Sequence, residues 1–270
     1  MRPFDLHIHS NMSDGTFAPE ELPALALERG VSRMALTDHD TAAGCARAIK
    51  AGRETGVQVI AGMEIDAEYS SELHILALNI DPDNESIRRY ERWRGEARVD
   101  RNRRILRKLR ALGMDVEHLM EHSMGNDTRL HIAKALVAGG YAATTAEAFE
   151  RYLNGGCPAY EPSDRISRKG AVELAADAGG VAVLAHPCQL KGDPHSLIKE
   201  LADHGLWGIE AYYSTSSPGH KKLFLSLARV YGLVPTCGSD FHGKNRHVSI
   251  GDGYEADRRL SAAYGALFAE

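Results

Sequence analysis

Short apolar runs along the chain follow directly after segments that have the pattern of helices ending in glycine. The run VSRMALT comes after Gly30 and VQVIAGMEI after Gly56, and the arrangement recurs at Gly179–Gly180, Gly205 and Gly232. Glycine adopts the left-handed conformation that ends a helix, and almost continuously apolar runs are typical of strands buried on both faces of a parallel sheet. With the runs FDLHIH and LHILAL, the pattern predicts about seven strands alternating with helices. We therefore expect an α/β fold with a barrel-like, seven-stranded sheet.

This alternation stops between Pro82 and Pro162, where the sequence is helical and contains no strand pattern. Helices are predicted over Glu85–Leu112, Val116–His122, Leu130–Ala138 and Thr145–Leu153. We interpret residues 81–160 as a small, all-helical insertion that covers the mouth of a barrel formed by residues 1–80 and 161–270.

The overall composition excludes several classes of protein. The 270 residues include 32 Lys and Arg against 37 Asp and Glu, which gives a net charge of −5. A general duplex DNA-binding protein would show a basic excess, and a membrane span would need about 18 consecutive apolar residues. The N-terminal sequence MRPFDLHIHS is unlike a signal peptide, and four scattered cysteines predict neither disulfides nor a thiolate zinc site. We expect a soluble cytoplasmic protein that binds neither duplex DNA nor a membrane.

One segment departs from this acidic balance. Residues 85–110 contain 11 Lys and Arg against four acidic residues. Such a helix either presents a solvated charged face or creates a local positive field that attracts a polyanion.

Histidines and carboxylates gather at the ends of the predicted strands, where α/β barrels keep their active sites. The residues at these ends are His7, His9, His39, Glu64, His74, His186, Asp240 and His242, with Asp14 in the loop after the first strand. A lone histidine on a strand is usually structural, but this many carboxylates and imidazoles at one rim need a compensating positive charge. Together they are the ligand set that Zn²⁺, Mn²⁺ or Fe²⁺ prefers. The sequence therefore predicts two or three divalent metal ions.

The motifs DLHIHS, SDG, TDHD, AHP and GSDFHG, with a glutamate ending the third strand, resemble those of the PHP (polymerase and histidinol phosphatase) superfamily. The resemblance extends over essentially the whole chain, including Arg129-Leu130-His131 in the insertion. It is strongest to the stand-alone branch of nucleoside-monophosphate and 3′,5′-bisphosphate phosphatases and the related 5′→3′ exoribonuclease. It implies a distorted seven-stranded (βα) barrel and metal-dependent phosphoester hydrolysis.

The resemblance also implies a role for each candidate ligand. One ion would be held by His7, His9, Glu64 and Asp240. A second would share Glu64 and add His186, completed by His131, His74 or both. A third would be held by Asp14, His39 and His242. Catalysis would then rest on Glu64, Asp240 and His242, with a hydroxide bridging two ions as the nucleophile.

Substrate recognition needs further residues. Arg129 could bind phosphate oxygens bidentately, although a surface arginine is the alternative interpretation, and His220 and Lys221 are weaker candidates. Tyr141, Phe149, Tyr152 and Tyr160 could stack on a base, or they could belong to a core. Cys188 and Cys237 lie near the motifs, where we expect them to fill space.

We expect a small phosphorylated substrate, a nucleotide monophosphate or 3′,5′-bisphosphate. The alternatives are histidinol phosphate and short single-stranded RNA ends. Two further classes remain, a C–N amidohydrolase and an inactive accessory module, but the chain has no lysine at a recognisable strand end and keeps every expected ligand.

Overall fold

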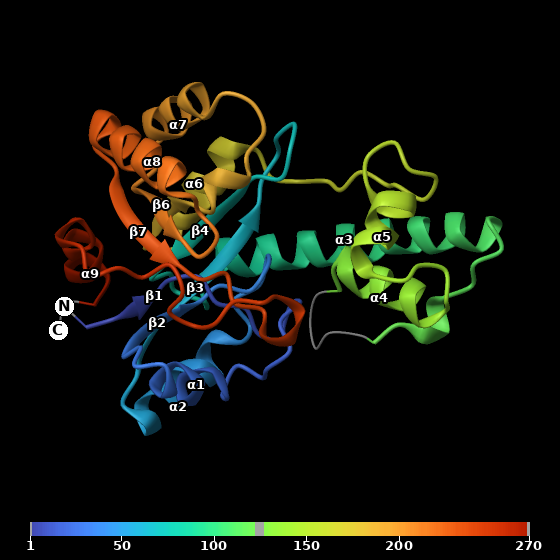
Figure 1. The fold of residues 1–270 in the computed structure, drawn as a ribbon, viewed down its shortest axis with the longest axis horizontal. Helices are drawn as coiled ribbons and strands as arrows, with labels where there is room; N and C mark the ends of the chain where they lie inside the picture. Colours follow the sequence, from blue (N-terminus) through green and yellow to red (C-terminus); the bar gives the residue numbers. More distant parts are fainter. Residues whose placement is uncertain (1, 122–126, 269–270) are drawn as a thin grey trace.

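The computed structural model describes residues 2–121 and 127–268 and contains a single seven-stranded sheet in sequential order. The strands are β1 (Phe4–Asp5), β2 (Arg33–Leu36), β3 (Gln58–Asp66), β4 (His74–Leu78), β5 (Val181–Leu184), β6 (Gly208–Tyr213) and β7 (Val234–Gly238). The sheet almost closes on itself, because the Leu6 N–H donates to the Cys237 carbonyl at 3.1 Å and Ile8 pairs in parallel with Phe241. The predicted distorted α/β barrel is confirmed (Figure 1).

Strand β4 departs from the parallel sheet that the sequence predicted. It runs antiparallel to both β3 and β5, whereas all other neighbouring pairs are parallel. The physical reason is the short connection over residues 67–73, since a parallel crossover needs about a dozen residues or more. The parallel arrangement inferred from the glycine-led runs therefore does not extend to this strand.

Helices surround the barrel at the positions that the glycine pattern predicted: α1 (Leu22–Glu28), α2 (Cys45–Thr55), α6 (Arg168–Asp177), α7 (Pro194–Asp203) and α8 (Pro218–Tyr231). A further helix, α9 (Ser261–Phe268), follows the last strand and was not predicted from the sequence. Two of the predicted stops show the mechanism directly, because Gly56 after α2 and Gly232 after α8 have φ angles of 78° and 66°. Only glycine adopts this left-handed conformation without a steric cost.

The insertion consists of α3 (Glu85–Ala111), α4 (Arg129–Ala138) and α5 (Thr145–Ala148), with a wider helical turn over Phe149–Leu153. The predicted helix Val116–His122 is reduced to a short 3₁₀ turn at Glu117–Leu119, and His122 lies outside the described residues. Figure 1 shows α4 and α5 packed around the far half of α3, beside the barrel and away from α9. None of the helices in the described parts of the chain has the length and apolarity to cross a membrane.

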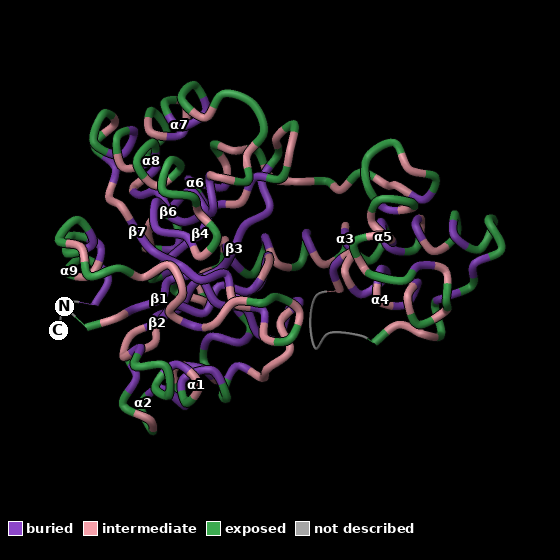
Figure 2. The backbone as a smooth tube through the Cα atoms, viewed as in Figure 1, coloured by how far each residue is buried: buried purple, intermediate pink, exposed green. Residues whose placement is uncertain are grey.

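Two separate groups of buried apolar residues correspond to these two parts. The larger fills the barrel, and the smaller includes Ile105, Leu109, Ile132, Leu136 and Leu153 of the insertion. Figure 2 shows both as purple segments of the chain. Helix α3 contributes to each, because Ile87 and Tyr90 in its first half pack against the barrel core. The boundaries of the insertion at residues 81 and 160 stay a proposal, because α3 packs against both cores.

Candidate metal centre and substrate pocket

The predicted ligands converge at one rim of the barrel. His7 and His9 follow β1, His39 follows β2, His186 follows β5, and Asp240 and His242 follow β7. His74 is instead the first residue of its strand, and it reaches the same rim because β4 runs antiparallel. Groups of three or four ligating side chains lie with their donor atoms within 4.8 Å of one another: His9/Asp14/His39/His242, His7/His9/Asp240, His7/Glu64/His186 and His39/Glu64/His74.

Glu64 lies at the centre of these groups, and its side chain is 1% exposed. Its Oε1 lies 2.8 Å from His74 Nδ1 and 2.9 Å from His186 Nε2, with His7 Nε2 at 3.3 Å. Its Oε2 lies 3.0 Å from His39 Nδ1 and 3.2 Å from His9 Nε2. Although burial opposes ionisation, the imidazoles hold the pKa of Glu64 well below its usual range. A carboxylate with two oxygens in separate donor groups is placed to bridge two cations.

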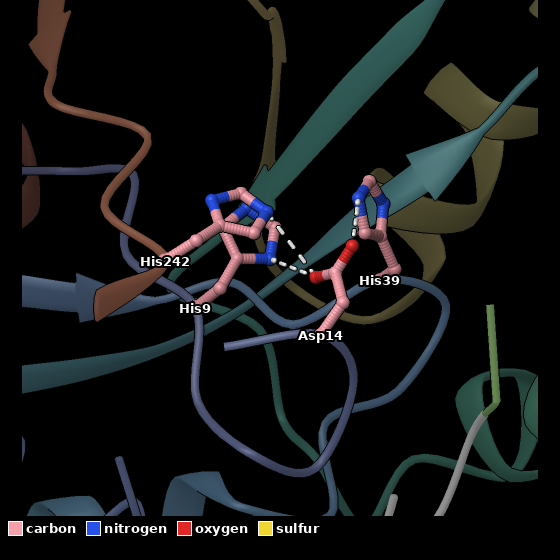
Figure 3. Close-up of side chains that lie close together, drawn as sticks. All are labelled: His9, Asp14, His39 and His242. Carbon is pink, nitrogen blue, oxygen red and sulfur yellow. Dashed lines mark ion pairs between the residues drawn. The ribbon is translucent and has the colours of Figure 1, made fainter. Parts of the chain in front are cut away.

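Asp14 gathers a second group of side chains, drawn in Figure 3. Its Oδ1 lies 3.2 Å from His242 Nε2 and 3.7 Å from His9 Nδ1, and its Oδ2 lies 3.8 Å from His39 Nε2. His9 contacts both this group and Glu64, whereas the resemblance assigned it to a single ion.

The loop that carries Asp14 is fixed by Asp38, which the sequence analysis quoted in a motif without giving it a role. Asp38 accepts hydrogen bonds from the Ser10 and Ser13 hydroxyls at 2.6 and 2.7 Å and from the Ser10 N–H at 2.8 Å. The Asn245 side chain donates to the Asp14 carbonyl at 2.6 Å and ties the loop to the segment after β7.

Asp240 joins the first group from the opposite side. Its Oδ1 lies 3.3 Å from His9 Nε2 and 3.5 Å from His7 Nε2, while Oδ2 accepts from the Tyr213 hydroxyl at 2.9 Å and pairs with Arg246. Asp240 and His186 have φ angles of 58° and 25°. Left-handed backbone at non-glycine residues is uncommon and concentrates at functional sites.

The buried carboxylates favour positive charge at this site. Burial alone would lower the pKa of His7 and His74, but neighbouring carboxylates raise the two values to about 10 and about 9. His9 and His39 behave differently, because burial lowers their pKa values to about 4 and about 3. Those two rings are therefore neutral near pH 7, as metal ligands must be.

The donor atoms also fit divalent metal ions. His9 Nδ1, Glu64 Oε2 and His242 Nε2 are buried and make no hydrogen bond of regular geometry, although a polar atom of another ligand lies close to each. Ring nitrogens face each other at 3.1 Å between His7 and His9 and at 3.2 Å between His74 and His186. Neutral imidazole lone pairs repel at such distances unless a proton or a cation lies between them. Nitrogen and carboxylate donors in compact groups are the ligands of Zn²⁺, Mn²⁺ and Fe²⁺.

His131 lies outside these groups. It is in the first turn of α4, where its Nδ1 accepts the Thr128 N–H at 3.0 Å while the Thr128 side chain accepts from Leu130 N–H. The ring thus forms part of a helix cap, and its assignment as a metal ligand stays a prediction.

A pocket of about 240 Å³ opens beside the ligands. Its lining includes the ligands Asp14, His39, His74 and His242 and the arginines Arg98, Arg101, Arg129, Arg165 and Arg246. The insertion therefore contributes to the pocket, and Arg129 is one of the residues that line it; its role in binding phosphate stays a prediction. His220 and Lys221 do not line this pocket; Lys221 pairs with Glu255 beside α8. Their substrate role stays a prediction.

Arg98 and Arg101 were counted among the basic residues of this helix, but the sequence analysis did not assign them to the site. Their spacing could have identified them. Arg94, Arg98 and Arg101 recur every three or four residues, which places them on one face of α3. All three are buried, at 0, 5 and 3% exposure. The interpretation of this helix as merely a solvated charged face is wrong for these residues.

Comparisons with known proteins agree with this site. Residues 5–154 match the PHP domain. The chain belongs to the PHP domain family. A phosphoribosyl 1,2-cyclic phosphate 1,2-diphosphodiesterase of Eggerthella lenta is 35% identical, over 89% of this chain and 94% of its own length. The 5′-3′ exoribonuclease Rnm of Salmonella typhimurium is 34% identical over 92% and 88%. A 3′,5′-nucleoside bisphosphate phosphatase of Chromobacterium violaceum is 32% identical over 90% and 88%.

Two solved structures share this fold over nearly the whole chain. A protein of Bifidobacterium adolescentis described as a metal-dependent phosphoesterase has a TM-score of 0.83 and 30% identity, over 97% of this chain and 95% of its own. A Chromobacterium violaceum protein described as an amidohydrolase with bound sulfate has a TM-score of 0.87 and 29% identity, over 98% and 96%. With these relatives and its own ligand groups, this PHP domain chain is a metal-dependent phosphoesterase.

The cysteines of the PHP domain chain lie apart from this chemistry. Cys45 and Cys237 are buried, and burial raises the pKa of the Cys45 thiol to about 12 and that of Cys237 well above its usual value. The four cysteines, all in described positions, are free thiols, and none lines the arginine-rich pocket.

Proposed function

We propose that this enzyme hydrolyses a phosphate monoester of a nucleotide, either a monophosphate or a 3′,5′-bisphosphate, with two or three Mn²⁺, Fe²⁺ or Zn²⁺ ions. Glu64 would be shared between two ions, with His7, His9 and Asp240 on one and His74 and His186 on the other. Asp14, His39 and His242 would hold the third. Such ions lower the pKa of a bound water and neutralise phosphate oxygens when they are present.

The observation that carries the nucleotide proposal is the environment of Arg101. Its side chain is buried at 3% exposure and lines the pocket, and its guanidinium donates to Asn102 Oδ1 at 2.8 Å. Burial and the nearby Arg98 and Arg129 hold its pKa well below the usual value. A buried charge is costly unless it is paired, so this guanidinium is set up to receive an anion.

The other pocket arginines already have carboxylate partners. Arg129 lies 3.3 Å from Glu72, Arg165 lies 2.9 Å from Asp66, Arg98 pairs with Asp40 and Arg246 with Asp240. Of the five pocket arginines, all in the described part of the chain, Arg101 alone has no carboxylate partner. A substrate with two anionic groups would fit this pocket. One phosphoryl group would bind the ions, and the second anionic group would pair with Arg101 and Arg129.

The nucleoside would extend beyond these arginines. Phe149 lines the pocket itself, and Tyr160 lines an adjoining cavity of about 170 Å³ that shares Arg129 and Arg165. Phe149 also packs against the core of the insertion, as do Tyr141 and Tyr152, which line neither cavity. Stacking on an aromatic ring contributes about 1–3 kcal/mol per base, which would rank nucleotides above simple phosphate esters.

A phosphate-release panel with Mn²⁺ tests the proposal. Adenosine 3′,5′-bisphosphate or AMP should show the highest kcat/KM, compared with histidinol phosphate and an aryl phosphate. Arg101→Gln should raise KM for the bisphosphate far more than for the aryl phosphate, whereas Arg103→Gln, at an exposed position of the same helix, should change neither. Equal efficiency on the aryl phosphate, or a preference for histidinol phosphate, would contradict the proposal.

The second candidate is 5′→3′ exonuclease activity on short single-stranded RNA. The adjoining cavity beyond Arg129 and Arg165 favours it, because an oligonucleotide needs room past the first nucleotide. A 5′-phosphorylated RNA in the same panel distinguishes the two, since stepwise release of mononucleotides identifies the exonuclease.

The remaining alternatives have less support. The residues lining the pocket, all of them described, include no lysine that could bridge ions as in C–N amidohydrolases, and the ligand groups are too complete for an inactive accessory module. We infer a cytoplasmic location, where nucleotides and RNA ends are found, and no role for duplex DNA.

A further inference from the structure

Beneath the ligand groups lies Glu210, a carboxylate to which neither the motifs nor the resemblance assigned a role. It is in β6 within the run GIEAYY, and its side chain is 0% exposed. Within the described chain, its one ion-pair partner is His7, and no Lys or Arg pairs with it. A charge buried in this way needs an explanation in the residues that it contacts.

The first contact fixes the ring of His7. Glu210 Oε1 and Oε2 lie 3.1 and 3.4 Å from His7 Nδ1. The other ring nitrogen, Nε2, lies 3.3 Å from Glu64 and 3.5 Å from Asp240. A carboxylate at Nδ1 favours the tautomer that carries its proton there, which leaves the Nε2 lone pair directed at the ion.

The second contact fixes the backbone of His186. The His186 N–H donates to Glu210 Oε2 at 2.7 Å, at a residue whose φ angle is 25°. The ring of His186 reaches Glu64 Oε1 at 2.9 Å. One buried carboxylate therefore contacts two ligands that follow different strands and that both reach Glu64 Oε1.

The neighbouring strand leaves room for this carboxylate. A Cβ atom on Gly238 would lie 2.0 Å from Glu210 Oε1 and 2.4 Å from His7 Cβ. Strand pairing between β6 and β7 is also irregular between Glu210 and Tyr212. Both features accommodate the Glu210 side chain.

We propose that Glu210 is a positioning residue that holds His7 and His186 in ligating orientation and thereby sets the affinity of the two ions that share Glu64. The inference rests on the ligand assignment of the proposed function, but not on the identity of the substrate. Because Glu210 touches neither ion nor substrate in this arrangement, its effect passes through the two histidines.

The test is a Mn²⁺ titration by calorimetry or chelator competition, without substrate. Glu210→Gln keeps the size of the side chain but has a single acceptor oxygen for two donors. It should weaken Mn²⁺ binding about 10- to 100-fold, the range typical of groups that orient metal ligands. The exposed Glu255→Gln is the matched control, and it should bind Mn²⁺ like the wild type.

A second measurement separates positioning from simple loss of fold. Thermal unfolding in chelator should give similar Tm values for the wild type and Glu210→Gln, and kcat should recover largely at saturating Mn²⁺. Should Glu210→Gln not fold, Glu210→Asp, whose shorter side chain keeps the charge but not the reach, should show the same weakening. Wild-type Mn²⁺ affinity in a folded Gln or Asp variant would overturn the inference. A failure of nucleotide hydrolysis would leave this binding experiment unaffected.

Discussion

Arg94 of the insertion and Asp40 of the barrel form an ion pair that is entirely buried. Arg94 Nη2 lies 2.8 Å from Asp40 Oδ2 and 3.0 Å from Asp66 Oδ2. Asp40 follows His39 directly, and its N–H donates to the Glu64 carbonyl at 2.8 Å. The helix that carries Arg98 and Arg101 of the pocket is therefore attached to the same backbone that presents His39 and Glu64.

Replacing Arg94 tests this attachment. Arg94→Met removes one cation from two buried carboxylates, and breaking a buried pair in this way costs about 3–5 kcal/mol. Because Arg98 remains beside Asp40, we expect the lower end of that range in the free energy of unfolding measured in urea. The exposed Arg92→Met, on the same helix, should change it by less than about 0.5 kcal/mol. Equal values for the two variants would show that the pair does not stabilise the fold.

Glu64 should be the most sensitive ligand. Glu64→Gln removes the negative charge of a carboxylate that faces five imidazoles. Groups that only orient a metal ligand change metal affinity by about 10- to 100-fold. For Glu64, a proposed ligand, we expect Mn²⁺ affinity to fall by more than about 100-fold. Elemental analysis and kcat measure the loss, with the exposed Glu54→Gln as control. Near-normal turnover would show that Glu64 does not bridge the ions.

Metal removal should lower stability and abolish activity together. A ligand that binds only the folded state stabilises it by about 2.7 kcal/mol at a concentration of 100 Kd. In a chain of this size we expect Tm to rise by about 2–4 °C per kcal/mol. Calorimetry with chelator and then with added Mn²⁺ measures this shift, and full activity in chelator would refute metal dependence.

The Asp14 group should be separable from the Glu64 groups. A Cβ atom on Gly15 would lie 2.6 Å from the His9 carbonyl oxygen, so Gly15→Ala should displace the loop that carries Asp14. We expect this variant to lose one metal equivalent and keep the others. Gly219→Ala, which has no contact closer than 3.8 Å, should keep all of them.

Thiol labelling tests the packing of the barrel. Cys45 and Cys237 are buried with raised pKa values, whereas Cys157 and Cys188 are partly exposed. At pH 8 a thiol reagent should modify Cys45 and Cys237 only after unfolding. Rapid modification of all four cysteines in the native protein would contradict this packing.

The sequence predicted the rim of ligands because parallel strands bring their carboxyl ends to one edge. His74 shows the limit of that reasoning, since it begins its strand and reaches the rim only through the reversed direction of β4. Arg101 could not be assigned to the pocket because its position depends on how α3 rotates against the barrel. Glu210 was missed because it is a single charge inside an apolar run, where no motif distinguishes a ligand-orienting carboxylate from a strand residue.

The insertion has a core of its own, and it meets the barrel through Arg94, Arg98 and Asp40 as well as through the shared helix α3. Its inner packing can therefore change without altering the packing of the strands that carry the metal ligands. Evolution can then diversify the arginine-lined wall while hydrolytic chemistry is inherited intact. In such an architecture, we expect relatives with different substrates to differ most at the pocket residues of α3, of α4 and of the turn Phe149–Leu153.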